Sequence, residues 1–230
     1  MTLATIELVI FDCDGVLVDS EPLAMRILLE TLAEAGVVLG TKEAYDAFLG
    51  KSLASVCEIL SRDHGVDIDA EALERMRARL YQAIRLELQP VSGIAGALEG
   101  LGKLACVASS SQPERIRLAL EVTGLTDYFG DNIFSAAMVA RGKPAPDLFL
   151  HAAREMRIDP RHCMVIEDSP AGVCAALEAG MRVLGFIGGS HAKSLPHRRK
   201  LEALGPHGMF DDMRDLPDLL LGLERSRKVS

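Results

Sequence analysis

Apolar residues are spaced in two different ways along the chain, and the change of spacing divides the sequence into two kinds of segment. Within residues 19–89 they recur every three or four positions, which is the spacing of one face of an amphipathic helix. Capping residues, prolines and glycines mark where such helices begin and end. Four helices are therefore expected in this segment, at about residues 22–36, 41–49, 52–63 and 69–88.

The rest of the chain carries short, continuous apolar runs that alternate with helical segments. Such runs are typical of strands buried on both faces of a sheet, and their alternation with helices predicts parallel pairing. Five strands are expected, at Ile6–Phe11, Leu104–Ser109, Ile133–Ser135, Cys163–Glu167 and Arg182–Phe186. The predicted fold is an α/β core formed by residues 1–18 and 90–230, with the helical segment 19–89 inserted after the first strand.

The first predicted strand ends in two acidic residues, in the stretch FDCDG. Side chains two positions apart in an extended segment point the same way, so Asp12 and Asp14 are expected to face the same space beyond the strand. Gly15 allows the chain to turn sharply there. Open α/β sheets bind ligands at the carboxyl ends of their strands, which makes these two residues a candidate functional site, although Asp and Gly are also ordinary turn residues.

Polar side chains follow the other predicted strands at the same edge of the sheet. Ser109 and Ser110 come at the end of the second strand, Glu167 and Asp168 at the end of the fourth, and Lys143 lies in the loop RGKPAPD. Each has an ordinary structural explanation, since serines cap helices, acidic residues favour helix N-termini and lysines are mostly solvated. It is their joint placement at one edge that indicates a site.

The four carboxylates at this edge would repel one another unless a cation neutralised them. All-oxygen ligands suit Mg²⁺, which binds one or two carboxylates together with waters and phosphate oxygens. With the metal bound, Lys143 and Ser109 could hold a phosphoryl group while one carboxylate attacks phosphorus. A second carboxylate two residues further on could exchange protons with the leaving group and with water. The residues themselves therefore predict Mg²⁺-assisted phosphoryl transfer.

Composition limits the other possible functions. The chain has 230 residues, 49% of them hydrophobic, which is enough for one substantial core with a smaller second domain. A formal net charge of -8, without a long basic stripe, argues against a nucleic-acid partner. The five cysteines form no CxxC pair and several lie in apolar runs, as reduced thiols do. No apolar stretch approaches the roughly 20 residues that span a bilayer, so we expect no membrane partner and a cytoplasmic location.

Four stretches, taken in order, resemble a known set of motifs: DCDGVLVDSE, VASSSQ, GKPAPD and VIEDSPAGVCAALEAGM. They are similar to the motifs of the haloacid dehalogenase-like hydrolase superfamily, in the branch that contains β-phosphoglucomutase and small phosphosugar phosphatases. The resemblance covers nearly the whole chain. It implies a Rossmann-like parallel sheet core with a four-helix cap domain inserted after strand one, in agreement with the two kinds of segment.

The resemblance also implies a role for each residue of the predicted site. Asp12 would be the nucleophile and Asp14 the general acid and base. The other implied positions are metal ligands and phosphate contacts: Asp12, the backbone carbonyl of Asp14 and Asp168 for Mg²⁺, with Glu167 as a nearby acid, and Ser109, Ser110 and Lys143 for the phosphate. In the cap, Gly50 and Lys51 are candidates for contact with the non-reacting part of the substrate, although a solvated lysine near a helix cap is an equally good explanation.

Other functions fit parts of the sequence less well. The stretch GKS suggests a nucleotide-binding loop, but Tyr45 stands where that motif requires glycine and no strand precedes it. A binding module that kept the fold and lost the chemistry is disfavoured by the intact set of site residues.

A phosphosugar mutase would use the same site as a phosphatase. In the phosphoglucomutase branch, a histidine after the first motif couples closure of the cap to the acid–base aspartate, and counting on from Asp12 places Ala24 at that position. Alanine can neither donate nor accept a proton. The expected function is therefore a Mg²⁺-dependent phosphatase that acts on a small phosphosugar or sugar-acid phosphate through an aspartyl-phosphate, as a monomer or homodimer.

Overall fold

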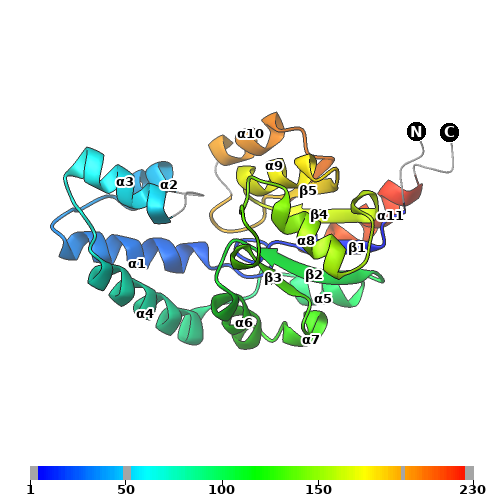
Figure 1. The fold of residues 1–230 in the computed structure, drawn as a ribbon, viewed down its shortest axis with the longest axis horizontal. Coiled ribbons are helices and arrows are strands. Elements are labelled where there is room, and N and C mark those ends of the chain that lie inside the picture. The colour runs from blue at the N-terminus through cyan, green and yellow to red at the C-terminus, as the bar shows by residue number, and fades with distance from the viewer. Residues whose placement is uncertain (1–4, 49–52, 193–194, 226–230) are drawn as a thin grey trace. The chain divides into compact units, whose positions relative to one another are not determined.

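The chain separates into two compact units. The structure, a computed structural model, describes residues 5–48, 53–192 and 195–225. One unit combines Met1–Asp19 with Gln89–Ser230, and the other is formed by Ser20–Leu88 (Figure 1). The helices of the second unit lie between strands β1 and β2 in the sequence, as predicted.

The first unit is built on a six-stranded parallel sheet with the strand order β3-β2-β1-β4-β5-β6. The strands are β1 Leu8–Phe11, β2 Leu104–Ser109, β3 Ile133–Ser135, β4 Cys163–Glu167, β5 Arg182–Phe186 and β6 Gly208–Phe210. All four residues of β1 are buried, which explains why its sequence is a continuous apolar run. The predicted fold class is confirmed. However, β1 begins two residues later than the sequence predicts, and β6 has no strand pattern because its three residues include a glycine.

Helices connect these strands and cover the sheet. They are α5 Ile94–Glu99, α6 Pro113–Val122, α7 Thr126–Phe129, α8 Asp147–Glu155, α9 Pro170–Glu178, α10 Leu195–Ala203 and α11 Leu216–Arg225, with the 3-10 turns η1 Ala136–Met138, η2 Pro160–His162 and η3 Met213–Asp215. One core cluster joins the central strands to α8 and α9 through fully buried residues such as Ile10, Val165, Phe149 and Val173. This packing holds the strand ends, and the residues that follow them, in place.

The register of the sheet aligns the ends of its central strands. Phe11 of β1 pairs with Val107 of β2 on one side and with Ile166 of β4 on the other. The Asp12 N–H extends this ladder by donating to the Ile166 carbonyl at 3.0 Å. The carboxyl ends of β1, β2 and β4 therefore lie at one edge, where a ligand site is expected in a parallel α/β sheet.

The second unit contains four helices within its described residues: α1 Glu21–Glu34, α2 Thr41–Phe48, α3 Leu53–His64 and α4 Ala70–Glu87. Their apolar faces meet in a separate core that includes the buried Leu32 and Phe48. Asp69 caps α4, because its carboxylate accepts a hydrogen bond from the Ala72 N–H at 2.7 Å. The unit thus has the amphipathic helices that the spacing of its apolar residues predicts.

The two connections to the inserted helices lie side by side within the first unit. The Asp19 N–H donates to the Gln89 carbonyl at 3.0 Å, and the Val91 N–H donates to the Leu17 carbonyl at 2.9 Å. The chain therefore leaves the core and returns to it through one short ladder of backbone hydrogen bonds.

Two further expectations can be compared with the structure. Within the described residues, no helix has both the length and the apolar character needed to cross a bilayer. Cys13, Cys106 and Cys163 are free and buried, as small apolar side chains would be. Burial raises the pKa of the Cys106 thiol and so favours its protonated form.

Candidate active site

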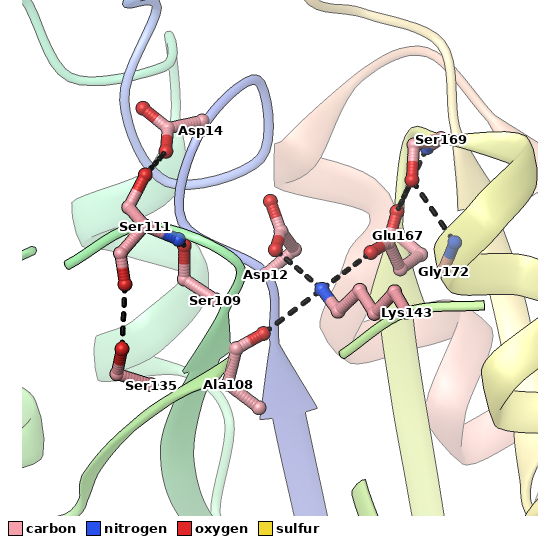
Figure 2. Close-up of polar contacts among 10 residues, drawn as sticks. All are labelled: Asp12, Asp14, Ala108, Ser109, Ser111, Ser135, Lys143, Glu167, Ser169 and Gly172. Atoms are coloured by element: carbon pink, nitrogen blue, oxygen red, sulfur yellow. Dashed lines mark hydrogen bonds and ion pairs between the residues drawn. The ribbon is translucent and has the colours of Figure 1, made fainter. Parts of the chain in front are cut away.

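A buried lysine joins two of the predicted acidic residues at the edge of the sheet. Lys143 Nζ lies 2.5 Å from Asp12 Oδ1 and 2.6 Å from Glu167 Oε1, and it donates to the Ala108 carbonyl at 3.0 Å (Figure 2). Asp12 follows β1, Ala108 belongs to β2 and Glu167 ends β4. One ammonium group therefore connects the carboxyl ends of three neighbouring strands.

The side chain of Lys143 is shielded from solvent and lies between charged groups. Its side chain is only 3% exposed, and Nζ lies 4.8 Å from the centre of the Phe149 ring. Burial alone lowers the pKa of Lys143, but the carboxylates of Asp12 and Glu167 outweigh this effect, and the pKa is raised. The sequence predicts a phosphate contact at this position. The structure adds a second role, in which one ammonium group contacts two carboxylates and offsets one of their two negative charges.

The first turn of α9 holds the other oxygen of Glu167. Glu167 Oε2 accepts hydrogen bonds from the Ser169 N–H at 2.7 Å and from the Ser169 hydroxyl at 2.9 Å. The same hydroxyl oxygen accepts from the Gly172 N–H at 3.0 Å and so caps the helix. A Cβ at Gly172 would lie 1.8 Å from Glu167 Oε1, so this turn requires a glycine. Glu167 is therefore fixed on both sides.

Asp12 lies among like charges and away from solvent. Burial is the main reason why the pKa of its carboxyl group is raised well above the usual range. Lys143 opposes this rise, whereas Glu167, Asp168 and Asp14 add to it. A further positive charge near Asp12 would favour its ionised form, which is the form needed in a nucleophile.

Asp14 contacts a different group of residues. Its Oδ2 accepts from the Ser111 hydroxyl at 2.6 Å, and its Oδ1 accepts from Arg115 Nη2 at 2.7 Å. The hydrogen bonds show that the two carboxylates have different partners, and the expectation that Asp12 and Asp14 face the same space stays a prediction. The chain turns after Cys13, whose carbonyl accepts two turn hydrogen bonds, and the two carboxylates meet separate partners (Figure 2).

The two predicted serines differ in their surroundings. Ser109 is buried at the end of β2, whereas Ser110 is exposed. Ser109 Oγ accepts from the Ser111 N–H at 3.1 Å, and the Ser135 hydroxyl donates to the Ser111 carbonyl at 2.7 Å. These bonds shape the loop that presents Ser111 to Asp14. Phosphate binding by Ser109 and Ser110 stays a prediction.

Asp168 brings another carboxylate against the loop after β1. It is 6% exposed, and a Cβ at Gly15 would lie 2.0 Å from its Oδ2. Gly15 also has a φ of +83°, a conformation that glycine adopts at little cost. Asp168 therefore lies beside the backbone that follows Asp14, in the space that the missing side chain leaves.

The donor set at this edge fits Mg²⁺. Within the described residues, no three acidic, histidine or cysteine side chains are grouped as a cage for a metal. Mg²⁺ needs no such cage, since it takes one or two carboxylates and completes its shell with water and phosphate oxygens. Lys143 and Arg115 offset two of the four carboxylates, and a divalent ion would balance the charge of the other two.

The structure places most of the predicted residues at one edge and adds three contacts that the sequence does not predict. Ser111 and Arg115 contact Asp14, and His191 Nε2 lies 2.7 Å from Asp168 Oδ2. The run of three serines is the only sequence signal for any of them, because Arg115 and His191 lie outside the four motifs. Gly50 and Lys51 lie outside the described residues.

Comparison with known families identifies the chain. Residues 6–180 match the haloacid dehalogenase-like hydrolase family. The chain belongs to this family, and the predicted family, fold and class of enzyme are confirmed.

Individual relatives are similar to the chain over nearly its whole length. The 6-phosphogluconate phosphatase of Escherichia coli strain K12 is 33% identical over 218 residues, which cover 94% of this chain and 96% of the relative. A haloacid dehalogenase-like protein of unknown function from Agrobacterium tumefaciens has a TM-score of 0.87 at 33% identity, with 95% of this chain and 99% of that chain covered. A hydrolase of the family from Deinococcus radiodurans, solved with bound phosphate and sodium, has a TM-score of 0.80 at 32% identity, with 96% and 97% covered.

Removing the buried ammonium group should destabilise the protein. Lys143→Met leaves Asp12 and Glu167 without their counter-charge, and we expect the free energy of unfolding in EDTA to fall by about 3–5 kcal/mol, measured by urea denaturation. Arg141→Met is the control. It breaks an ion pair with Asp147 whose arginine is 69% exposed, and should cost less than about 1 kcal/mol. Equal losses in the two variants would contradict the role assigned to Lys143.

Proposed function

We propose that the chain is a Mg²⁺-dependent phosphatase that hydrolyses a small phosphosugar or sugar-acid phosphate through an aspartyl-phosphate intermediate. The observation that supports this most directly is the contact of Lys143 with both Asp12 and Glu167 at the carboxyl ends of the central strands. It combines a buried carboxylate with a neighbouring cation. A phosphoryl group that entered there would meet a nucleophile and positive charge together.

Asp12 is the proposed nucleophile. One of its carboxylate oxygens bonds to phosphorus as the bond from phosphorus to the leaving oxygen breaks, which produces the aspartyl phosphate. Lys143, already beside Asp12, offsets the negative charge of the transferred group. Mg²⁺, when held by Asp12, Asp168 and the Asp14 carbonyl, supplies further neutralisation of the phosphoryl oxygens.

Asp14 is the proposed acid and base. Its protonated carboxyl group gives a proton to the leaving oxygen, so that the product alcohol departs neutral. The resulting carboxylate takes a proton from the water that attacks phosphorus, which releases phosphate and regenerates Asp12. Ser111 and Arg115 both donate to the Asp14 carboxylate and so orient the group that exchanges the proton.

The substrate class is proposed from the inserted helices and from a relative. The inserted helices are proposed to act as a cap that excludes bulk water and macromolecules, which favours small phosphorylated metabolites. The relative with 33% identity is a 6-phosphogluconate phosphatase, so a sugar-acid phosphate of that kind is the first compound to test.

Replacing the nucleophile should abolish turnover. Asp12→Asn substitutes an amide for the attacking carboxylate, and we expect phosphate release from 6-phosphogluconate and from p-nitrophenyl phosphate with Mg²⁺ to fall by at least about a thousandfold. Asp131→Asn, which changes an exposed aspartate, should keep full activity. Substantial activity of folded Asp12→Asn, shown by mass to be free of deamidated protein, would refute the mechanism.

Lys51 is proposed to contact the non-reacting part of the substrate, on the strength of its position in the stretch FLGKSLAS. Contacts of this kind support the chemical step. Lys51→Ala should therefore lower kcat/KM for the physiological substrate much more than for p-nitrophenyl phosphate, which has no such part. Lys42→Ala is the matched control. A similar loss for both substrates would argue that Lys51 is only a solvated lysine.

Hydrolysis should prevail over isomerisation, because Ala24 stands where the phosphoglucomutase branch has a histidine. A mutase must protect its aspartyl phosphate from water, so it needs cap closure linked to the acid–base residue. With β-glucose 1-phosphate and a trace of the bisphosphate, phosphorus NMR should show inorganic phosphate and no accumulation of glucose 6-phosphate. Faster appearance of glucose 6-phosphate would instead establish the mutase.

A further inference from the structure

One buried histidine outside the four motifs is directed at a proposed metal ligand. The His191 side chain is 3% exposed, and its Nε2 lies 2.7 Å from Asp168 Oδ2. An ionised carboxylate only accepts hydrogen bonds, so Nε2 carries the proton and donates it. Asp168 itself is 8% exposed at its side chain, so water does not compete freely for this contact.

The imidazole ring fits closely between two glycines. A Cβ at Gly15 would lie 2.7 Å from His191 Cε1, and one at Gly189 would lie 2.9 Å from the same atom. The turn after Asp14 and the loop after β5 thus both leave room for this ring. The position of the ring is set by backbone on two sides, and its hydrogen bond to Asp168 is set with it.

The loop that carries His191 is anchored at two further points. The Ser190 hydroxyl donates to Asp19 Oδ1 at 2.7 Å, and the Ala192 N–H donates to the Gly189 carbonyl at 3.0 Å. Beyond the loop, His197 Nε2 lies 2.7 Å from the Asp168 carbonyl, which makes it the donor of a second hydrogen bond to the same residue. Asp168 is therefore held at its side chain and at its backbone by two histidines that follow β5.

We propose that His191 is a positioning residue for the divalent cation, which it serves by orienting the Asp168 carboxylate. The inference rests on the proposed function, because it takes Asp168 as a metal ligand. A hydrogen bond to one oxygen of a ligating carboxylate fixes its direction and leaves the other oxygen for the metal.

The test measures metal binding directly. Mn²⁺ prefers the same oxygen ligands as Mg²⁺, and the EPR signal of free Mn²⁺ reports its affinity for the full chain. We expect His191→Phe, which keeps a ring but has no N–H, to bind Mn²⁺ about 10–100-fold more weakly. His191→Gln, which keeps an N–H at similar reach, should recover most of the affinity. His191→Asn, whose amide is too short to reach Asp168, should behave as His191→Phe does.

His162→Phe is the matched control, because His162 also contacts a carboxylate, that of Glu7, but lies before β4 at the other end of the strand. Its Mn²⁺ affinity should stay within about twofold of the wild type. If His191→Phe does not fold, as judged by circular dichroism, the comparison of His191→Asn with His191→Gln takes its place. Unchanged affinity in the variants that lack the donor, or an equal loss in His191→Gln, would overturn the proposal.

Activity then separates this inference from the proposed function. With a phosphate ester, the variants that lack the donor should need more Mg²⁺ for half-maximal rate, while kcat at saturating Mg²⁺ stays within a few-fold of the wild type. A kcat loss that excess Mg²⁺ does not restore would overturn the positioning role. Wild-type protein that binds Mn²⁺ in a His191-dependent way but hydrolyses no phosphate ester would support this inference and refute the phosphatase. Wild-type protein that binds no Mn²⁺ would overturn both.

Discussion

A single buried ammonium group allows two carboxylates to share the edge of the sheet. Asp12 and Glu167 end adjacent strands, and the parallel register brings them together whether or not their charges favour it. Desolvation and mutual repulsion would otherwise drive them to protonate or to move apart. Lys143 prevents this by contacting both carboxylates.

The same edge keeps its two aspartates from one strand in different electrostatic surroundings. Asp12 faces Lys143 and lies among other carboxylates, whereas Asp14 is held by Ser111 and Arg115. The proposed nucleophile and the proposed proton carrier need different environments, and Asp12 and Asp14 have different partners although they are only two positions apart in the sequence. Two carboxyl groups with identical neighbours would have similar pKa values and could not act one as a nucleophile and the other as a proton donor.

Strand ends could be predicted from the sequence because a buried parallel strand is an apolar run that stops abruptly. Asp12, Ser109 and Glu167 are each the first polar residue at such a stop, so their common edge followed from topology alone. The partners of these side chains depend on finer geometry. The direction of the Asp14 side chain depends on the turn after Cys13, and the spacing of apolar residues does not predict the shape of a turn. His191 contacts Asp168 from a loop that follows a different strand. Apart from β6, the strands were predictable, and β6 was missed because its three residues include a glycine and show no strand pattern.

The ladder that joins Leu17 to Val91 and Asp19 to Gln89 closes the core on itself. An inserted segment between those residues therefore has to begin and end at neighbouring points of the core. The entropic cost of closing a longer insertion grows slowly, by about 0.6 kcal/mol for each doubling of its length. In evolutionary terms the inserted helices are an exchangeable module. Their sequence can diverge, lengthen or be replaced while the strand ends and the contacts of Lys143 stay in place, so a lineage of such proteins can vary this segment without rebuilding the sheet.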